Sequence, residues 1–145
     1  MKFLIDTNII LDVLLKREPF YDSCANVLQL SKQDNIDLYV SASAITDIYY
    51  IANQTLRDKE KVKNLLAKLI KVVSIAGVSE DEIINALELS WKDFEDSVQY
   101  SVALLQEMDG IVTRNPNDYQ DAEIKIWKPE EFCEENRLQE STKDL

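Results

Sequence analysis

The stretch Phe3-Leu4-Ile5-Asp6-Thr7-Asn8-Ile9-Ile10-Leu11-Asp12 decides the fold class of this chain. Its first three apolar residues suit a short buried strand, and Asp6-Thr7-Asn8 can cap a helix formed by the apolar residues that follow. A strand that passes directly into a helix is the beginning of a β-α-β unit. The opening residues therefore predict an α/β protein.

The same alternation continues to residue 127. Short apolar strands are predicted at residues 2–5, 38–40, 72–75, 111–112 and 124–127, with amphipathic helices between them. Helix starts are marked by Ser41 or Ser43, by Ser79 with Glu82 in a capping-box pattern, and by Asp93 or Asp96. Short apolar strands separated by helices are typical of a parallel sheet covered on both faces. We therefore expect a three-layer α/β/α sandwich around a central, mainly parallel sheet of about five short strands.

Length and composition indicate one domain. A chain of 145 residues with 46% hydrophobic content can bury a core of its own, and we assign residues 1–129 to it. Residues 130–145 are expected to form a polar C-terminal tail that is mobile at its end. No apolar run is long enough for a membrane span or a secretory signal. Cys24, expected in the core, and Cys133, expected to be incidental, are too few for a disulfide framework, so we expect a cytoplasmic protein.

The composition also excludes several kinds of catalytic site. The chain has no histidine, which rules out Ser-His-Asp and Cys-His sites and makes a zinc site improbable. Gly77 and Gly110 are its two glycines, whereas phosphate-binding loops need several in one loop. The abundant reactive groups are carboxylates, 27 Asp and Glu against 16 Lys and Arg, for a net charge of -11. Such hard oxygen ligands suit magnesium or manganese.

One segment is basic despite the acidic total. Residues 54–71 contain six basic side chains against two acidic ones. This segment could follow the phosphates of a nucleic acid, present a solvated helix face with Glu/Lys pairs, or meet an acidic partner protein.

Candidate site residues follow the predicted strands. In a parallel sheet, ligands bind at the carboxyl ends of the strands, where Asp6 and Thr113-Arg114-Asn115 should share one crevice. Asp47 and Asp96 could point into that crevice from neighbouring helices. Carboxylates forced together are costly unless cations neutralise them. Bound magnesium would also attract a phosphodiester and activate an attacking water, so the sequence predicts metal-dependent hydrolysis without histidine.

Four stretches lie in order along the chain: residues 3–12 (FLIDTNIILD), 41–50 (SASAITDIYY), 93–99 (DFEDSVQ) and 111–115 (IVTRN). Together they resemble the PIN-domain family, many bacterial members of which are VapC-type toxin ribonucleases of toxin-antitoxin pairs. The resemblance covers roughly Met1 to Trp127. It implies a PIN-like α/β/α fold and an endoribonuclease that cuts RNA with one or two Mg²⁺ or Mn²⁺ ions. It also implies an antitoxin protein as partner, and a homodimer through exposed apolar residues of the early helices is plausible.

The resemblance also assigns roles to residues. Asp6 matches the first metal ligand and Asp96 the central one. Asp47 stands where the family usually has Glu, so its shorter side chain would reach the metal through water. Asn115 stands where the family usually has Asp, so a second metal would bind weakly or need Asp118 or Asp93. Asn8 and Thr113 match polar positions that orient the cluster or the scissile phosphate. Beside them, Arg114 could contact the phosphate.

Other interpretations remain open for these residues. Asp6 could cap the first helix, Asp96 could be the third-position partner of an Asp93 cap, and Asn115 before Pro116 could serve a turn. Glu95 is expected at the surface, and Arg114 could face solvent. The departures at Asp47 and Asn115 suggest, as an alternative, a catalytically degenerate PIN-like module that binds RNA or a protein partner. A magnesium-dependent phosphatase is less favoured, because Asn8 replaces the second strand-end Asp that such enzymes commonly carry.

Overall fold

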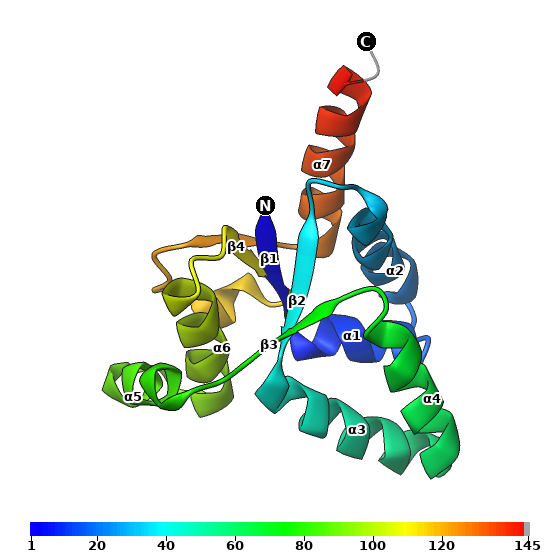
Figure 1. Ribbon diagram of the computed structural model, residues 1–145, viewed down its shortest axis with the longest axis horizontal. Coiled ribbons are helices and arrows are strands. Elements are labelled where there is room, and N and C mark those ends of the chain that lie inside the picture. The colour runs from blue at the N-terminus through cyan, green and yellow to red at the C-terminus, as the bar shows by residue number, and fades with distance from the viewer. Residues whose placement is uncertain (144–145) are drawn as a thin grey trace.

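Five parallel strands form the centre of the molecule (Figure 1). The computed structural model describes residues 1–143, with side chains for residues 1–136. The strand order is β3-β2-β1-β4-β5, and the predicted parallel sheet of five short strands is confirmed. β1 is central, with Leu4 level with Tyr39 of β2 and Ile111 of β4. The strands are β1 (Lys2–Ile5), β2 (Asp37–Ser41), β3 (Ser74–Ala76), β4 (Gly110–Val112) and β5 (Lys125–Trp127).

Helices cover both faces of the sheet, as the predicted three-layer arrangement requires (Figure 1). Phe3 and Ile5 face one core, to which five helices contribute buried residues. Leu4 faces the other core, to which two helices contribute buried residues. The first layer contains α1 (Thr7–Leu14), α2 (Tyr21–Gln29), α3 (Ala42–Leu56), α4 (Lys59–Leu69) and α7 (Pro129–Lys143). The second layer contains α5 (Glu80–Glu88) and α6 (Phe94–Leu105), and short 3-10 turns lie at η1 (Leu30–Lys32) and η2 (Pro116–Tyr119).

Most of the predicted helix starts are confirmed. The hydroxyl of Ser41 accepts the backbone N–H of Ala44 at 3.3 Å. Ser79 and Glu82 form the capping box at the start of α5. The third strand begins two residues later than expected, because the backbone after α4 folds back on itself, with the N–H of Val73 donating to the Leu69 carbonyl at 3.0 Å. None of the helices within residues 1–143 combines the length and apolar content needed to cross a bilayer.

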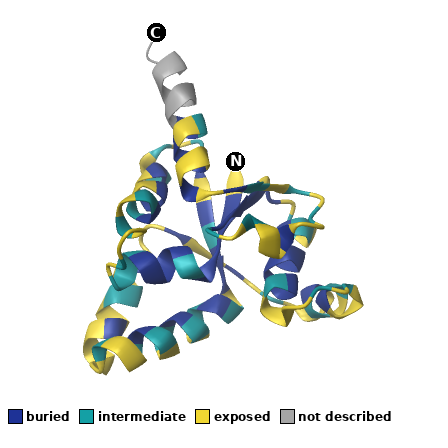
Figure 2. Cartoon of the chain, turned by 180° about the vertical axis from the view of Figure 1, so that it is seen from behind, coloured by how far each residue is buried: buried dark blue, intermediate teal, exposed yellow. Residues whose placement is uncertain are grey.

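The segment after β5 differs from the expected polar tail. It begins as helix α7, whose first turns include buried positions (Figure 2) and pack into the core that contains Phe3. The Phe132 ring is fully buried and packs edge-on against Phe3, with the ring centroids 4.7 Å apart. Cys133 is also buried, so it is a core residue rather than an incidental one. The expected mobile end falls on residues 144–145, which lie outside the described residues.

Candidate metal centre

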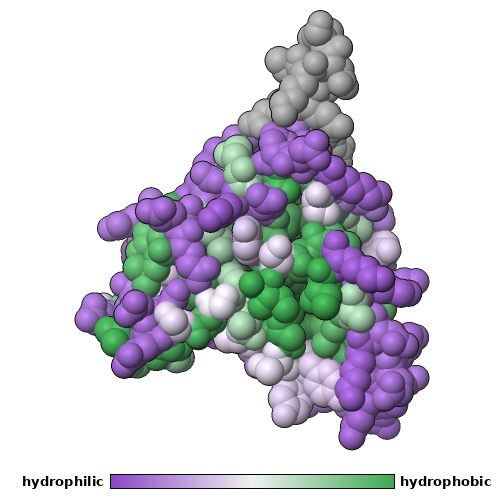
Figure 3. Space-filling model, in the orientation of Figure 1, coloured by the Kyte–Doolittle hydropathy of each residue, from purple (hydrophilic) through white to green (hydrophobic). Residues whose placement is uncertain are grey.

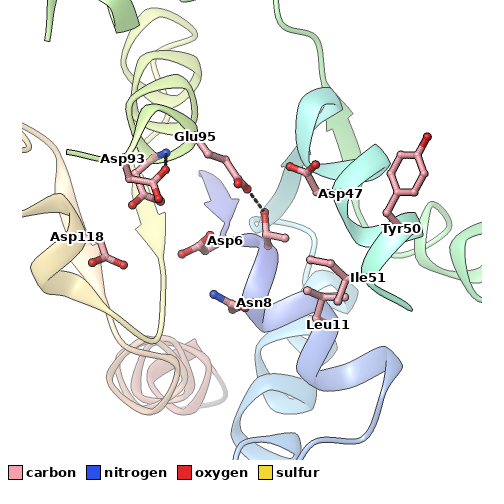
Figure 4. A pocket seen from close by; sticks show the side chains of 11 residues that line it. Asp6, Asn8, Leu11, Asp47, Tyr50, Ile51, Asp93, Glu95 and Asp118 are labelled. Carbon is pink, nitrogen blue, oxygen red and sulfur yellow. Dashed lines mark hydrogen bonds between the residues drawn. The ribbon is translucent and has the colours of Figure 1, made fainter. Parts of the chain in front are cut away.

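A cavity of about 370 Å³ opens where β1 ends and α1 begins (Figure 4). Carboxylates approach it from the end of β1, from α3, from the start of α6 and from η2. Its lining residues include no lysine or arginine. This is the edge of a parallel sheet at which ligands bind. The acidic side chains that line it are Asp6, Asp47, Asp93, Glu95, Asp96 and Asp118.

Asp6 is the most firmly held of these carboxylates. It occupies the N-cap position of α1, but its side chain makes no capping hydrogen bond, so the capping interpretation of the carboxylate is wrong. Instead, Oδ2 accepts the Thr113 hydroxyl at 2.7 Å and Oδ1 accepts the amide of Gln99 at 2.9 Å. Thr113 is fixed in turn, because its hydroxyl accepts the backbone N–H of Asn115 at 3.1 Å. The ends of β1 and β4 are thus joined through the site.

The start of α6 supplies three of the acidic side chains. Asp93 caps the helix by accepting the backbone N–H of Asp96 at 3.2 Å. The Asp96 carboxylate lines the cavity and lies 3.5 Å from the Tyr119 hydroxyl. Glu95 is exposed, as expected, but it also lines the cavity and accepts the Thr7 hydroxyl at 3.3 Å (Figure 4). One helix cap therefore turns neighbouring carboxylates toward Asp6.

The crowding of negative charge alters protonation in this cavity. Burial, reinforced by Asp93 and Asp6, raises the pKa of Asp96 to about 7. Although the residue as a whole is exposed, partial burial of its carboxylate and then Asp47 raise the pKa of Glu95 above its ordinary value. The pKa of Tyr119 is also well above its usual range, mainly through burial and then through Asp6. A divalent cation in this cavity would favour the ionised carboxylates and reverse these shifts.

The chemistry of the donors fits magnesium or manganese, which take carboxylate and amide oxygens. Such oxygens are available from six acidic side chains and from Asn8. Within residues 1–136, however, no three acidic or cysteine side chains already converge as a ready-made set of ligands. An ion would therefore have to draw carboxylates together by side-chain rotation.

Five of the predicted site residues line the cavity, and three others do not. The cavity is lined by Asp6, Asn8, Asp47, Asp96 and Asp118. The three that do not line it are Thr113, Arg114 and Asn115. Of these, Thr113 contacts Asp6 from behind, and the exposed Asn115 contributes its backbone N–H.

Arg114 faces a buried acid rather than solvent. Its Nε lies 2.6 Å from Oδ2 of Asp12, and its Nη2 donates to the other oxygen at 3.5 Å. The Nε contact is an ion pair without hydrogen-bond geometry. The guanidinium also lies 3.9 Å from the centre of the Phe20 ring. Because Asp12 is fully buried, the pair fastens the loop after β4 to α1.

Two further residues of the site were not anticipated from the sequence. Gln99 and Tyr119 are both 1% exposed and contact the site carboxylates from the side of α6 and η2. A glutamine three residues after Asp96 shares its helix face, and this spacing could have indicated Gln99. Tyr119 follows Asp118 directly, but nothing in the local pattern distinguishes its hydroxyl from that of a core tyrosine.

Comparison with known proteins now identifies the family. A family profile described as the PIN domain matches residues 2–117. This chain belongs to the PIN domain family. The PIN resemblance carried by the four sequence stretches is therefore confirmed. A comparison with curated protein sequences gives no significant match.

Solved structures share this PIN fold at low sequence identity. VapBC2 from Rickettsia felis, bound to a DNA fragment from its promoter, is 18% identical with a TM-score of 0.67, covering 88% of this chain and 100% of that one. VapBC-1 from Haemophilus influenzae is 16% identical with a TM-score of 0.68, covering 89% and 98%. Mycobacterium tuberculosis VapC20, a sarcin-ricin loop cleaving toxin, is 13% identical with a TM-score of 0.59, covering 75% and 86%. At this identity the likeness establishes a VapC-like fold.

Proposed function

We propose that this PIN protein is a metal-dependent endoribonuclease and the toxin of a toxin-antitoxin pair. The observation that carries the proposal is the cavity at the end of β1, where six acidic side chains gather without a basic residue in the lining. Such an arrangement is unfavourable in a resting protein and becomes favourable when divalent cations bind. A sarcin-ricin loop cleaving toxin among the structural relatives supports RNA as the substrate.

The residues of this chain have distinct tasks in the proposed reaction. Asp6 and Asp96 would hold a Mg²⁺ or Mn²⁺ ion, with Asp47 reaching it through water and Asp118 completing a second, weaker site. Such an ion polarises a phosphoryl oxygen and lowers the pKa of a water molecule, which supplies the nucleophile. Thr113 keeps Asp6 oriented through their 2.7 Å hydrogen bond. Asn8 lines the cavity beside Asp6 and would contact the scissile phosphate.

A second candidate function is a catalytically degenerate PIN module that binds RNA or protein. Two observations favour it: Asn115 lies outside the cavity lining, and no described set of three ligands is preformed. Metal binding separates the two candidates. An intact site should stabilise the folded chain in proportion to the logarithm of the metal concentration, whereas a degenerate one should not.

We also infer an antitoxin-type protein partner, which the VapBC complexes among the structural relatives support. A groove of about 550 Å³ is lined by residues of α1, α2 and α4 and of the segments next to them. Figure 3 shows hydrophobic side chains gathered near the middle of the face that Figure 1 presents. Leu14, Leu28 and Leu65 line the groove together with Lys32, Lys68 and Lys71. An acidic amphipathic segment of a partner could place its apolar face against the leucines and its carboxylates against the lysines. A homodimer through exposed apolar side chains, such as Phe20, is a second mode of association.

RNA cleavage tests the proposed nuclease directly. Purified protein should cut a mixed RNA pool when manganese is present and stop when a chelator is added. Asp6→Asn and Asp96→Asn should each reduce the rate by at least about a hundredfold, because ligand charge is lost where the reaction occurs. Asp34→Asn, which removes an exposed acid in the loop before β2, should cut like the unmodified chain.

The outcomes distinguish the candidate functions. Metal-dependent cutting that both site variants lose supports the nuclease. Equal cutting by all variants would indicate a contaminating enzyme and contradict the assignment of the site. Absence of cutting in several RNA pools, together with no thermal stabilisation by manganese, would favour the degenerate module.

A further inference from the structure

Two buried polar residues connect Asp6 to Asp96 across the candidate site. The side-chain amide of Gln99 donates to Oδ1 of Asp6 at 2.9 Å and to the Tyr119 hydroxyl at 3.3 Å. The same hydroxyl donates to Oδ1 of Asp96 at 3.5 Å, which is long for a hydrogen bond. Both amide hydrogens of Gln99 and the hydroxyl hydrogen of Tyr119 are thus committed, and donation runs outward from Gln99, directly to Asp6 and through Tyr119 to Asp96.

The orientation of the Gln99 amide supports a role toward the carboxylates. Its Nε2 faces two acceptors, while its Oε1 is buried without a hydrogen-bond partner in the described structure. The flipped amide would place an oxygen against the Asp6 carboxylate, which is unfavourable. Leaving a buried amide oxygen unpaired destabilises the fold, whereas an apolar side chain of similar shape avoids this cost. Packing alone therefore does not explain a glutamine at this position.

The hydroxyl of Tyr119 is likewise not needed for its packing. The ring lies in the core between the sheet and α6 and packs edge-on against Trp91, with centroids 5.9 Å apart. A phenylalanine would make the same ring contacts. The hydroxyl instead reaches the site, where it meets Gln99 on one side and Asp96 on the other.

We propose that Gln99 and Tyr119 are positioning residues that hold Asp6 and Asp96 as a pair for a divalent cation. This inference rests on the proposed function, because it assigns the two carboxylates to a metal. Positioning matters here because no three acidic side chains within residues 1–136 already converge, so an ion would depend on the two carboxylates that are held while the others rotate toward it. Groups that hold ligands in place commonly change metal affinity by about 10–100-fold when they are removed.

The chain contains a matched control for Tyr119. Tyr100 is also buried in the same core and also packs against Trp91, with ring centroids 4.7 Å apart. Its hydroxyl accepts the backbone N–H of Glu123 at 3.0 Å. Tyr100→Phe therefore removes a tyrosine hydroxyl from the same core, as Tyr119→Phe does, but the hydroxyl that it removes bonds to Glu123 and not to Gln99 or Asp96, so the link to the carboxylates stays intact.

Calorimetric titration with Mn²⁺ alone tests the proposal. Tyr119→Phe should weaken the affinity for Mn²⁺ by about tenfold, and Gln99→Met should weaken it at least as much. Tyr100→Phe should change it by less than about twofold. The double variant Gln99→Met/Tyr119→Phe should lose less than the sum of the single losses, because the two residues act through one connection. The thermal unfolding midpoint of each variant shows whether a loss of affinity reflects a loss of folding.

The results separate this inference from the proposed function. If the unmodified chain binds Mn²⁺ and Tyr119→Phe binds it as tightly as Tyr100→Phe does, the positioning role is overturned and the nuclease proposal stands. If the unmodified chain does not bind Mn²⁺, both are overturned. If Tyr119→Phe fails to fold, Gln99→Met decides, since unchanged Mn²⁺ affinity in that variant would overturn the proposal.

Discussion

The Asp96 side chain shows how one residue can oppose the stability of the fold that contains it. Its pKa is about 7 in the folded chain, against an ordinary value of 3.8. Between these values the folded state retains a proton that the unfolded state has released. The contribution of Asp96 to the free energy of unfolding therefore falls as pH rises through this window.

Replacing this carboxyl should make the metal-free protein more stable at high pH. In the presence of chelator, Asp96→Asn should unfold at a higher temperature than the unmodified chain above pH 7, and the difference should shrink as the pH falls toward 4. Circular dichroism melts over a pH series measure this difference. The exposed acid Asp34 provides the control, since Asp34→Asn should show no comparable pH-dependent gain. A stabilisation by Asp96→Asn that is constant with pH would contradict the assigned pKa.

At this scale the sequence predicted the carboxylates that line the cavity better than the residues that hold them. Asp6 and Asp96 could be found because one ends a buried strand and the other begins a helix, which are local patterns. Gln99 and Tyr119 acquire their roles only when α6 and η2 meet beside β1. The partner of Arg114 was missed for the same reason, since Asp12 lies 102 positions away in the sequence.

A buried ion pair between Asp12 of α1 and Arg114 of the loop after β4 joins these two elements. Asp12 also receives the Cys24 thiol of α2 at 3.6 Å, and Arg17 approaches it at 3.7 Å. Burial, together with the adjacent Asp12, raises the pKa of the Cys24 thiol to about 12, so this cysteine remains an unreactive core residue. Asp12 thus connects three segments of the first layer.

Removing one partner of the Asp12–Arg114 pair should destabilise the folded state more than removing both partners. Asp12→Ala should lower the free energy of unfolding by about 3 kcal/mol, because it leaves the largely buried Arg114 without its carboxylate. Asp12→Ala/Arg114→Met should recover part of that loss, since no unpaired charge remains. Urea titration of both variants and of Arg114→Met alone measures the coupling. Equal losses in Asp12→Ala and the double variant would contradict a buried pair.

Several element boundaries followed from local signals, namely a cap or an apolar run. β1 was predicted to the residue, and the capping box of α5 was found from Ser79 and Glu82. α7 was missed because the buried apolar residues of its described part, Phe132 and Cys133, lie in a segment rich in glutamate. Tertiary contact of Phe132 with Phe3 decides its position, and residue 132 alone carries no sign of that contact.

The negative charge of the whole molecule affects how a nucleic-acid substrate could approach it. The net charge is -11, and the cavity has no basic residue in its lining. The basic residues of α4 are exposed, and none of them lines the carboxylate cavity. If the substrate approaches mainly through divalent ions, few counterions should be released from its backbone by lysine or arginine.

RNA recognition should therefore depend weakly on monovalent salt. At a fixed concentration of free Mn²⁺, the KM for RNA should stay nearly constant or decrease when KCl is raised from about 50 to about 200 mM. Over the same range of salt, interfaces with many lysine contacts lose orders of magnitude in affinity. Steady-state cleavage measures KM at each salt concentration. A steep rise of KM with salt, abolished when Lys59, Lys61 and Lys63 are replaced by glutamine, would instead show that α4 follows the phosphates.

The hydrogen bond from Thr113 to Asp6 spans 107 positions of the chain, and that from Gln99 to Asp6 spans 93. Contacts of such high sequence separation form late in folding, because the entropy of closing a long loop must be overcome first. A partly folded chain can hold native helices and still lack the site altogether. Under the proposed function, RNA cleavage would then require the completed topology, and a misfolded or locally collapsed population of this protein would leave RNA uncut.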